Sequence, residues 1–379
     1  MGKIHYIGWY IGENEFGQYT GNIPGMLKMR YVAEMIIRAG LPLEVLSLAS
    51  CKSFSFPKRI RQKHGFNVMY TLSLGRNNGL CKRLENCLKR IWFKLYILFN
   101  VKKNDTILLY HSVGYTNYLK HIRKKHPLNV ILEVEEVYGY SAVKDQDWVQ
   151  DELSGILSMD KFMFVNSGIP RYLNIPRDKY VVSYGVGTLP QRNAARFDDG
   201  KIHLVYAGTI EKRKLGAFTA VETAQFLSDK YVMHILGFGK EDSIAIMQEK
   251  IKENNSKEGV CPIYYEGYKA GSDLDDFLFK CHIGISTNVM RPNFANNTFP
   301  SKVITYMCHD LTVVLGYADA FKDAPFVEGW TFYYDHTPQT IATAIKEARL
   351  VDEGFFRPMI EKMNNDLISF LVESSKVES

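Results

Sequence analysis

Hydrophobic and polar residues alternate along this chain in a regular order. Short apolar runs of strand length, such as 3–11 (KIHYIGWYI), 106–112 (TILLYHS) and 202–208 (IHLVYAG), are bounded by glycine or polar residues. Stretches with apolar residues at helical spacing lie between these runs. Alternating strands and helices are typical of parallel sheets covered by helices. The pattern therefore predicts an α/β protein.

The polar segment 188–200 (TLPQRNAARFDDG) separates two such series of strands and helices. It contains proline and glycine and has no apolar run, as linkers between domains often do. The 379 residues are also enough for two hydrophobic cores. We expect a first domain over 1–187, a linker at 188–200, a second domain over 201–340 and C-terminal helices over 341–379.

The composition favours a cytoplasmic protein, with the inner face of the cytoplasmic membrane as a further location. No apolar run reaches the roughly 18–20 residues that span a bilayer, and the N-terminal residues read as a strand and loop rather than a signal peptide. The six cysteines have neither metal-ligand spacing nor the density of a disulfide framework. Cys261, Cys281 and Cys308 lie beside apolar runs, which predicts buried free thiols.

Positive charge is concentrated in the first half of the chain. Residues 1–187 contain 26 Lys/Arg and 15 Asp/Glu, whereas the remainder contains 21 and 26. This asymmetry indicates an anionic partner for the first half, such as phospholipid headgroups, a diphosphate-bearing acceptor or nucleic acid. Because no nucleic-acid recognition motif accompanies the charge, we expect no nucleic-acid partner.

An amphipathic helix is predicted over 80–103 (LCKRLENCLKRIWFKLYILFNVKK). Its apolar residues at 84, 88, 91, 92, 95, 96 and 99 form one stripe, and lysine or arginine at 82, 83, 89, 90 and 94 flanks it. A basic helix rich in aromatics suits a membrane interface. Packing of the same stripe on the domain core is the alternative.

The segment 284–316 predicts a buried strand, a polar loop, a helix and a second strand. Pro300 suits the first helical turn, because its fixed φ fits there and its missing N–H would have no partner; Ser301 and Lys302 follow it. The free N–H groups of a helix start and a nearby lysine suit a phosphate. A solvated lysine on an ordinary strand–loop–helix is the alternative.

With the segments 202–227, 231–242 and 263–287, this stretch resembles the nucleotide-sugar-binding domain of GT-B glycosyltransferases, most closely those of family 4. The motif PSKVITYMC (300–308) is similar to the family's P-S-K-x-x-E-Y-M-A. The resemblance implies a GT-B fold, with two Rossmann-like domains whose parallel sheets face each other across a cleft, and a last helix that crosses back to the first domain. Thr209 stands where the family has arginine, and Asn297 and Thr305 stand where it has glutamates.

The resemblance also implies a binding site for a UDP- or GDP-linked sugar. The donor-binding candidates by position are Gly21, Asn22, Thr209, Gly237, Tyr268, Asn296, Asn297, Pro300, Ser301, Lys302 and Thr305. Arg213 or Lys214 aligns with a family lysine that neutralises the leaving diphosphate. A solvated turn is the alternative for these two residues.

Candidates for acceptor chemistry follow strands of the first domain. Glu135 and Glu136 end one strand and His111 follows another. A carboxylate or imidazole beside a cleft can accept a proton or bind acceptor hydroxyls; a solvated strand end and a structural histidine are the alternatives. The catalytic candidates are therefore Arg213, Lys214, Glu135, Glu136 and His111. No metal-ligand cluster is visible, so we expect neither a metal nor a cofactor.

We therefore expect a hexosyl-type glycosyltransferase that uses a nucleotide sugar and a glycan acceptor. By the resemblance, it retains the anomeric configuration without a metal, and its acceptor is lipid-linked in bacterial surface-polysaccharide assembly, such as that of capsule or exopolysaccharide. A catalytically degenerate partner or chaperone of another glycosyltransferase is one alternative, and a sugar-nucleotide epimerase is another.

Overall fold

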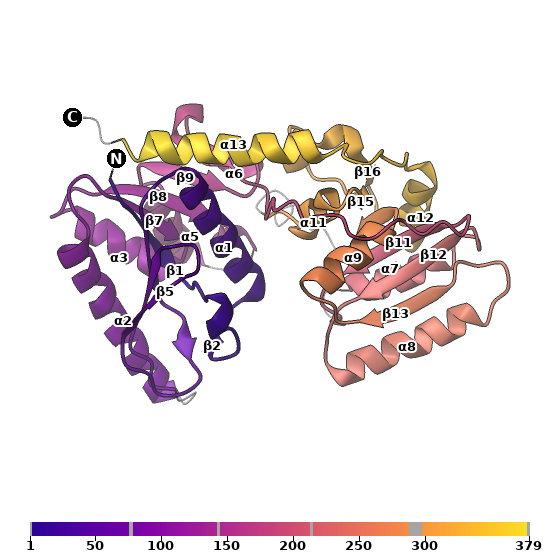
Figure 1. The fold of residues 1–379 in the computed structure, drawn as a ribbon, viewed down its shortest axis with the longest axis horizontal. Coiled ribbons are helices and arrows are strands. Elements are labelled where there is room, and N and C mark those ends of the chain that lie inside the picture. Colours follow the sequence, from indigo (N-terminus) through magenta and orange to yellow (C-terminus); the bar gives the residue numbers. More distant parts are fainter. Residues whose placement is uncertain (1, 76–78, 142–144, 213–214, 288–297, 377–379) are drawn as a thin grey trace. The chain divides into compact units, whose positions relative to one another are not determined.

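The computed structural model describes residues 2–75, 79–141, 145–212, 215–287 and 298–376, which form two compact units (Figure 1). Unit 1 consists of Met1–Val186 together with Met363–Ser379, and unit 2 consists of Gly187–Lys362. Each unit has its own sheet of mainly parallel strands, with helices between them along the chain. The predicted α/β class is therefore confirmed.

In the described part of unit 1, eight strands form a sheet in the order β10-β9-β8-β7-β1-β3-β6-β5. All neighbours are parallel except β5 and β6. The strands of unit 1 are β1 (Ile4–Gly8), β2 (Tyr19–Thr20), β3 (Leu43–Ser47), β4 (Ser50–Cys51), β5 (Lys58–Arg61), β6 (Asn67–Tyr70), β7 (Thr106–Tyr110), β8 (Asn129–Val134), β9 (Lys161–Phe164) and β10 (Tyr180–Val182). Its α-helices are α1 (Ile23–Arg38), α2 (Gly79–Asn100), α3 (Val113–Arg123), α4 (Tyr138–Ser141), α5 (Gln146–Ile156) and α6 (Gly168–Tyr172).

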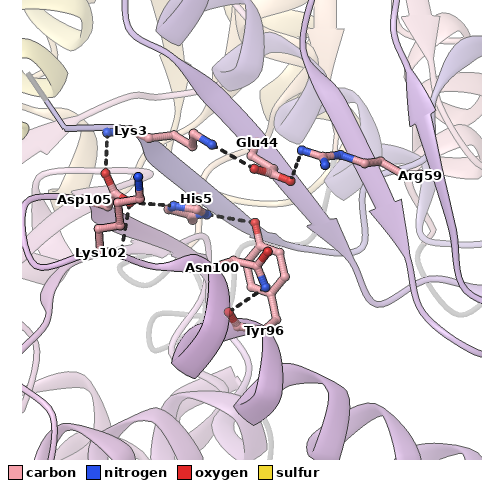
Figure 2. A network of polar contacts seen from close by, with 8 residues as sticks. All are labelled: Lys3, His5, Glu44, Arg59, Tyr96, Asn100, Lys102 and Asp105. Carbon is pink, nitrogen blue, oxygen red and sulfur yellow. Dashed lines mark hydrogen bonds and ion pairs between the residues drawn. The ribbon is translucent and has the colours of Figure 1, made fainter.

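Helices cover both faces of this sheet because side chains alternate along each strand. In β1, Ile4 and Tyr6 pack into a core cluster with α1. His5 points to the opposite face, where its ring bonds to the Tyr96 hydroxyl of α2 at 2.8 Å (Figure 2). Figure 1 accordingly draws α1 and α2 on opposite sides of the strands.

The segment 51–79, which its polar composition predicts to be an exposed excursion, contains two strands of the sheet. Strand β6 is parallel to β3, and β5 pairs with β6 as the antiparallel edge. The prediction was wrong here because this edge of the sheet carries many charged residues, as edge strands often do. The apolar run 41–50 is divided between β3 and the start of β4.

Helix α2 confirms the helix predicted over 80–103, and of the two interpretations of its apolar stripe, packing on the domain core does not hold for most of the stripe. The buried residues are Glu85, Lys89, Phe93, Tyr96 and Ile97. Most of the predicted stripe is exposed, including the leucine, isoleucine and phenylalanine side chains at 84, 91, 95 and 99. The helix therefore packs through a mixed polar and aromatic face and leaves an apolar face uncovered.

In the described part of unit 2, six strands form a parallel sheet in the order β13-β12-β11-β14-β15-β16. The strands are β11 (Ile202–Ala207), β12 (Tyr231–Leu236), β13 (Ile263–Gly267), β14 (Ile283–Ser286), β15 (Thr312–Gly316) and β16 (Trp330–Tyr333). The α-helices are α7 (Gly216–Ala224), α8 (Glu241–Asn255), α9 (Ser272–Lys280), α11 (Lys302–Cys308) and α12 (Pro338–Glu347). The three cysteines predicted to be buried, Cys261, Cys281 and Cys308, are buried free thiols of this unit.

Two helices lie in the last part of the described chain. Helix α12 ends at Glu347, and α13 (Arg357–Ser374) follows it. From Met363 onward α13 belongs to unit 1, where Phe370 and Leu371 pack into the core cluster that contains α1. In unit 2, Phe355 and Phe356 pack so closely on Gly329 that no side chain would fit there.

Candidate functional site

A pocket of about 730 Å³ lies in unit 1 where the order of the strands reverses. From β1 the chain continues to β3 on one side of the sheet, and later to β7 and β8 on the other. Open α/β sheets bind ligands beyond the carboxyl ends of their strands at such a reversal. Trp9 follows β1, and His111 and Ser112 follow β7, so the pocket occupies this position.

Aromatic and methionine side chains form much of the pocket wall. The described lining residues are Trp9, Asn22, Gly25, Met26, Met29, Tyr110, His111, Ser112, Val113, Gly114, Glu136, Tyr138 and Trp148. Glu136 is the one carboxylate among them, and none of them is a lysine or arginine. Such a wall suits an uncharged ligand that presents both apolar faces and hydrogen-bonding groups.

Both ring nitrogens of His111 are engaged within unit 1. Nδ1 lies 3.0 Å from the Thr116 hydroxyl, and Nε2 lies 2.9 Å from a Glu152 carboxylate oxygen. Glu152 also accepts the backbone N–H groups of Tyr138 and Gly139, at 2.9 and 2.6 Å. The Tyr138 ring stacks on His111 with their centres 5.5 Å apart. This geometry suits a residue that positions the pocket wall.

The glutamates at the end of β8 have different surroundings. Glu136 lines the pocket, whereas Glu135 lies 3.6 Å from the buried ammonium of Lys28. That ammonium donates hydrogen bonds to the carbonyl and hydroxyl of Ser183 at 2.7 and 2.9 Å. Of the two predicted carboxylates, the structure therefore brings Glu136 to the pocket and pairs Glu135 with a lysine of α1.

Glu133, which precedes them on β8, is completely buried. The Tyr6 hydroxyl donates to its Oε2, and its Oε1 has no hydrogen-bond partner among the described residues. Burial, reinforced by the charge of Glu135, raises the pKa of Glu133 to about 8. The native protein therefore retains at neutral pH a carboxyl proton that the unfolded chain releases.

This proton makes the stability of the protein pH-dependent. The contribution of Glu133 is complete below the pKa of an unfolded glutamate, about 4.3, and is lost as the pH rises through about 8. Between pH 5 and pH 8.5, the free energy of unfolding should fall several-fold less for Glu133→Gln than for the native chain, because glutamine stays neutral. Urea unfolding at a series of pH values measures this, with the pocket-lining Glu136→Gln as control. Parallel pH profiles for all three proteins would contradict the prediction.

In unit 2 the strand order reverses between β11 and β14. Gly208 follows β11, and Lys302 is the first residue of α11. The Lys302 ammonium lies 3.9 Å from the centre of the Tyr206 ring, on β11. It also lies 3.0 Å from the position that a Cβ on Gly208 would take. Glycine at 208 therefore leaves room for a lysine charge at the carboxyl end of β11.

Backbone groups meet closely at the ends of β11, β12 and β13. The Gly237 N–H donates to the Gly267 carbonyl at 2.9 Å, and a Cβ on Gly237 would lie 1.8 Å from the Gly208 carbonyl oxygen. Gly237 also has a φ of 150°, in the region that favours glycine. Beyond it, the half-exposed rings of Phe238 and Tyr268 meet edge to face at 5.4 Å. The site thus combines closely packed glycine backbone with an accessible aromatic pair.

The other predicted donor-site residues are distributed over both units. Pro300 and the exposed Ser301 precede α11, and half-buried Thr305 lies one turn beyond Lys302. Thr209 follows Gly208, and its carbonyl accepts the Tyr206 hydroxyl at 3.4 Å. Exposed Gly21 and pocket-lining Asn22 belong to unit 1. Four predicted residues lie outside the described residues: Arg213, Lys214, Asn296 and Asn297.

Sequence reasoning missed several residues that shape these two sites. In unit 1 they are the pocket tryptophans Trp9 and Trp148 and the buried Glu152. In unit 2 they are Tyr206 beneath the lysine and Phe238 beside Tyr268. Phe238 lies between two glycines at the end of a strand, and this position in the sequence could have identified it as a site residue. Nothing local marks the others, because distant segments give them their roles.

Two kinds of feature are absent from the described residues. None of the helices there is both long and apolar enough to cross a membrane. The same residues contain no group of three or more His, Cys, Asp or Glu side chains arranged to hold a metal ion.

No protein-family model and no curated protein matches the sequence. Solved structures match its fold over nearly the whole chain. One, described as trehalose-6-phosphate from E. coli bound with UDP-2-fluoro glucose, is 10% identical over 98% of this chain and 96% of its own, with a TM-score of 0.63. A sucrose-phosphate synthase from Thermosynechococcus elongatus is 11% identical over 97% and 94%, also with a TM-score of 0.63.

A UDP-forming α,α-trehalose-phosphate synthase from Burkholderia xenovorans, in complex with glucose-6-phosphate, is 10% identical over 98% of this chain and 97% of its own, with a TM-score of 0.62. These structures share two α/β domains with parallel sheets, so the predicted GT-B fold class is confirmed. At this level of identity the likeness concerns the fold alone.

Proposed function

We propose that this chain is a glycosyltransferase that moves a hexose from a nucleotide sugar bound by unit 2 to a glycan acceptor bound by unit 1. The observation that carries the proposal is the Lys302 ammonium beside Gly208, at the strand reversal of unit 2. Transfer breaks the bond between the anomeric carbon and a phosphate oxygen, so negative charge develops on the leaving diphosphate. A fixed cation at that position stabilises this charge.

The surroundings of Lys302 also suit the rest of a nucleotide. Half-buried Gly208 follows β11 beside the lysine and has no side chain of its own to occupy the space that a phosphate would need. The exposed faces of Phe238 and Tyr268 offer a base the stacking contacts that aromatic side chains provide. UDP-2-fluoro glucose, the ligand of the E. coli structure, is a molecule of this class.

The pocket of unit 1 favours a glycan acceptor over a sugar phosphate. Its aromatic walls can stack on the apolar faces of a sugar ring, and Asn22, Ser112 and Glu136 can bind hydroxyls. A sugar phosphate, such as the glucose-6-phosphate of the Burkholderia xenovorans structure, needs a cation, and the described lining has no lysine or arginine. We assign Glu136 the role of orienting or deprotonating the acceptor hydroxyl.

The proposal extends to details that rest on the family 4 resemblance of PSKVITYMC. We infer a lipid-linked acceptor in bacterial surface-polysaccharide assembly, in the cytoplasm or at the inner face of the cytoplasmic membrane. We also infer retention of the anomeric configuration without a metal cofactor. In such a reaction the donor phosphate can accept the proton of the acceptor, so unit 2 needs no nucleophilic carboxylate.

Nucleotide binding tests the proposal directly. We expect one of UDP, GDP, CMP, ADP and dTDP to raise the melting temperature selectively, since a ligand at 100 times its Kd stabilises by about 2.7 kcal/mol. Lys302→Ala should greatly reduce the shift. Lys346→Ala, at an exposed lysine of α12 in the same unit, is the matched control and should leave it unchanged.

Three outcomes are informative. Selective stabilisation followed by transfer from the matching nucleotide sugar supports the proposal. Stabilisation without transfer to any glycan favours a degenerate partner protein, an alternative suggested by Thr305 in place of the family's glutamate. If no nucleotide stabilises the protein, the assignment of a donor site to unit 2 is contradicted.

A further inference from the structure

Helix α2 presents an uncovered apolar face to solvent. Leu80 and Phe99, near its two ends, are 80% and 81% exposed, and Leu84 and Ile91 between them are 54% and 53% exposed. Leu95 and Leu98 continue the same face. Single exposed apolar residues are common on protein surfaces, but a continuous apolar face along a 22-residue helix is a mark of an interaction surface.

Specific contacts prevent α2 from rotating to bury these side chains. Near its start, buried Lys89 pairs with Glu85 at 2.7 Å and donates to the Leu48 carbonyl at 3.0 Å. Near its end, the Tyr96 hydroxyl lies 2.8 Å from His5 Nδ1, and His5 Nε2 lies 3.1 Å from Asp105 (Figure 2). Rotation would break both sets of buried contacts. The apolar face is therefore fixed outward.

Exposed positive charge accompanies the apolar face on the same helix. Lys82, Arg83, Arg90 and Lys94 are all exposed on α2. Glu85, the single acidic residue of the helix, is buried against Lys89 and does not offset this charge at the surface. The exposed part of α2 is thus apolar and cationic along its whole length.

A second segment of unit 1 adds the same kinds of side chain. Phe54 and Phe56, in the loop after β4, are 56% and 72% exposed, and exposed Lys52 lies beside them. Strand β4, which precedes this loop, is tied to α2, because the Ser50 hydroxyl donates to Glu85 at 2.6 Å. This segment therefore carries the same kinds of exposed side chain as the exposed residues of α2, which we call the α2 surface.

We propose that the α2 surface binds the protein to an anionic lipid membrane. Apolar side chains enter the region between headgroups and acyl chains, and the flanking cations contact anionic headgroups. A second copy of the chain is a poorer occupant, since a symmetric contact would bring the same four cations of each copy together. This proposal does not depend on glycosyl transfer, because it concerns neither pocket Glu136 nor Lys302.

Vesicle flotation with the full chain tests the proposal. We expect binding to vesicles of phosphatidylcholine with about one-third phosphatidylglycerol, at least tenfold weaker binding to phosphatidylcholine alone, and weaker binding in 0.5 M salt. Ile91→Ser with Leu95→Ser should lower the affinity about tenfold or more, as should Arg90→Gln with Lys94→Gln. These positions are exposed, so the variants should keep the native melting temperature.

Matched controls lie elsewhere on unit 1. Leu157→Ser removes another half-exposed leucine, and Lys124→Gln with Lys125→Gln removes two exposed cations. Both controls should bind as the native chain does. Equal binding by the α2 variants and the controls, or no preference for anionic vesicles, would overturn the proposal. So would a dimer in sedimentation that Ile91→Ser with Leu95→Ser dissociates, because a second copy would then occupy the surface.

Discussion

Lys302→Met is expected to lower kcat/KM for glycosyl transfer by roughly 10²–10³-fold, the usual cost of removing one group that stabilises transition-state charge. Methionine keeps most of the apolar stem but removes the ammonium that lies over Tyr206 and beside Gly208. Most of the loss should fall on kcat, because charge on the leaving diphosphate is largest in the transition state.

Two further variants separate this role from a merely structural one. Lys302→Arg keeps the charge and should recover part of the rate, although guanidinium geometry differs from that of an ammonium. Lys346→Met, at an exposed position of unit 2, should retain full activity. The measurement is steady-state transfer from the nucleotide sugar identified by thermal shift. A kcat within threefold of the native value for Lys302→Met would refute the assignment, provided that the melting temperature is unchanged.

Lys89→Met in α2 is expected to lower the free energy of unfolding by about 3–5 kcal/mol, the range for breaking a buried ion pair by removing one partner. The side chains of Lys89 and Glu85 are 3% and 8% exposed. Burial opposes ionisation of Glu85, but its hydrogen bonds with Lys89, Ser50 and the Leu74 backbone outweigh this and lower its pKa. Without Lys89, a buried carboxylate remains without its cation.

Urea unfolding of single and double variants measures this pair. The double variant Glu85→Gln with Lys89→Met should lose less free energy of unfolding than the two single variants together, because no unpaired charge remains. Lys82→Met, at an exposed position of the same helix, should change stability by about 0.5 kcal/mol or less. Protonation neutralises a Glu85 that has lost its cation, so the cost of Lys89→Met should be smaller below the pKa of an ordinary glutamate, about 4.3, than at pH 7. Additive losses would show that the pair is not coupled.

The ion pair of Glu85 and Lys89 links the stability of the protein to the α2 surface. The ion pair that anchors α2 also determines that the leucine and isoleucine side chains on its other face stay in solvent. If Lys89→Met unfolds α2 locally, it should also weaken vesicle binding, whereas Lys82→Met should weaken binding without loss of stability. The two effects are therefore separable by experiment.

The sequence by itself determined the features that depend on local periodicity and backbone preference. Apolar runs of strand length predicted the parallel strands, such as β1, β7 and β11, because a buried strand requires them. Pro300 predicted the start of α11 to within two residues, because its φ is fixed and it lacks an N–H. Gly40 follows the apolar helical pattern of α1 in the sequence, and it has the positive φ of 70° that suits a helix terminus.

The tertiary structure alone decided which groups meet. Periodicity predicted that α2 is amphipathic, but it could not show that the pair Glu85–Lys89 is buried and the leucines are exposed, since a polar pair can be buried when its partners lie in distant strands. The contact of Lys302 with Tyr206 and the tryptophans of the unit 1 pocket likewise join residues far apart in sequence. Local sequence determines how each element folds, whereas the packing of distant elements determines where its charges and rings lie.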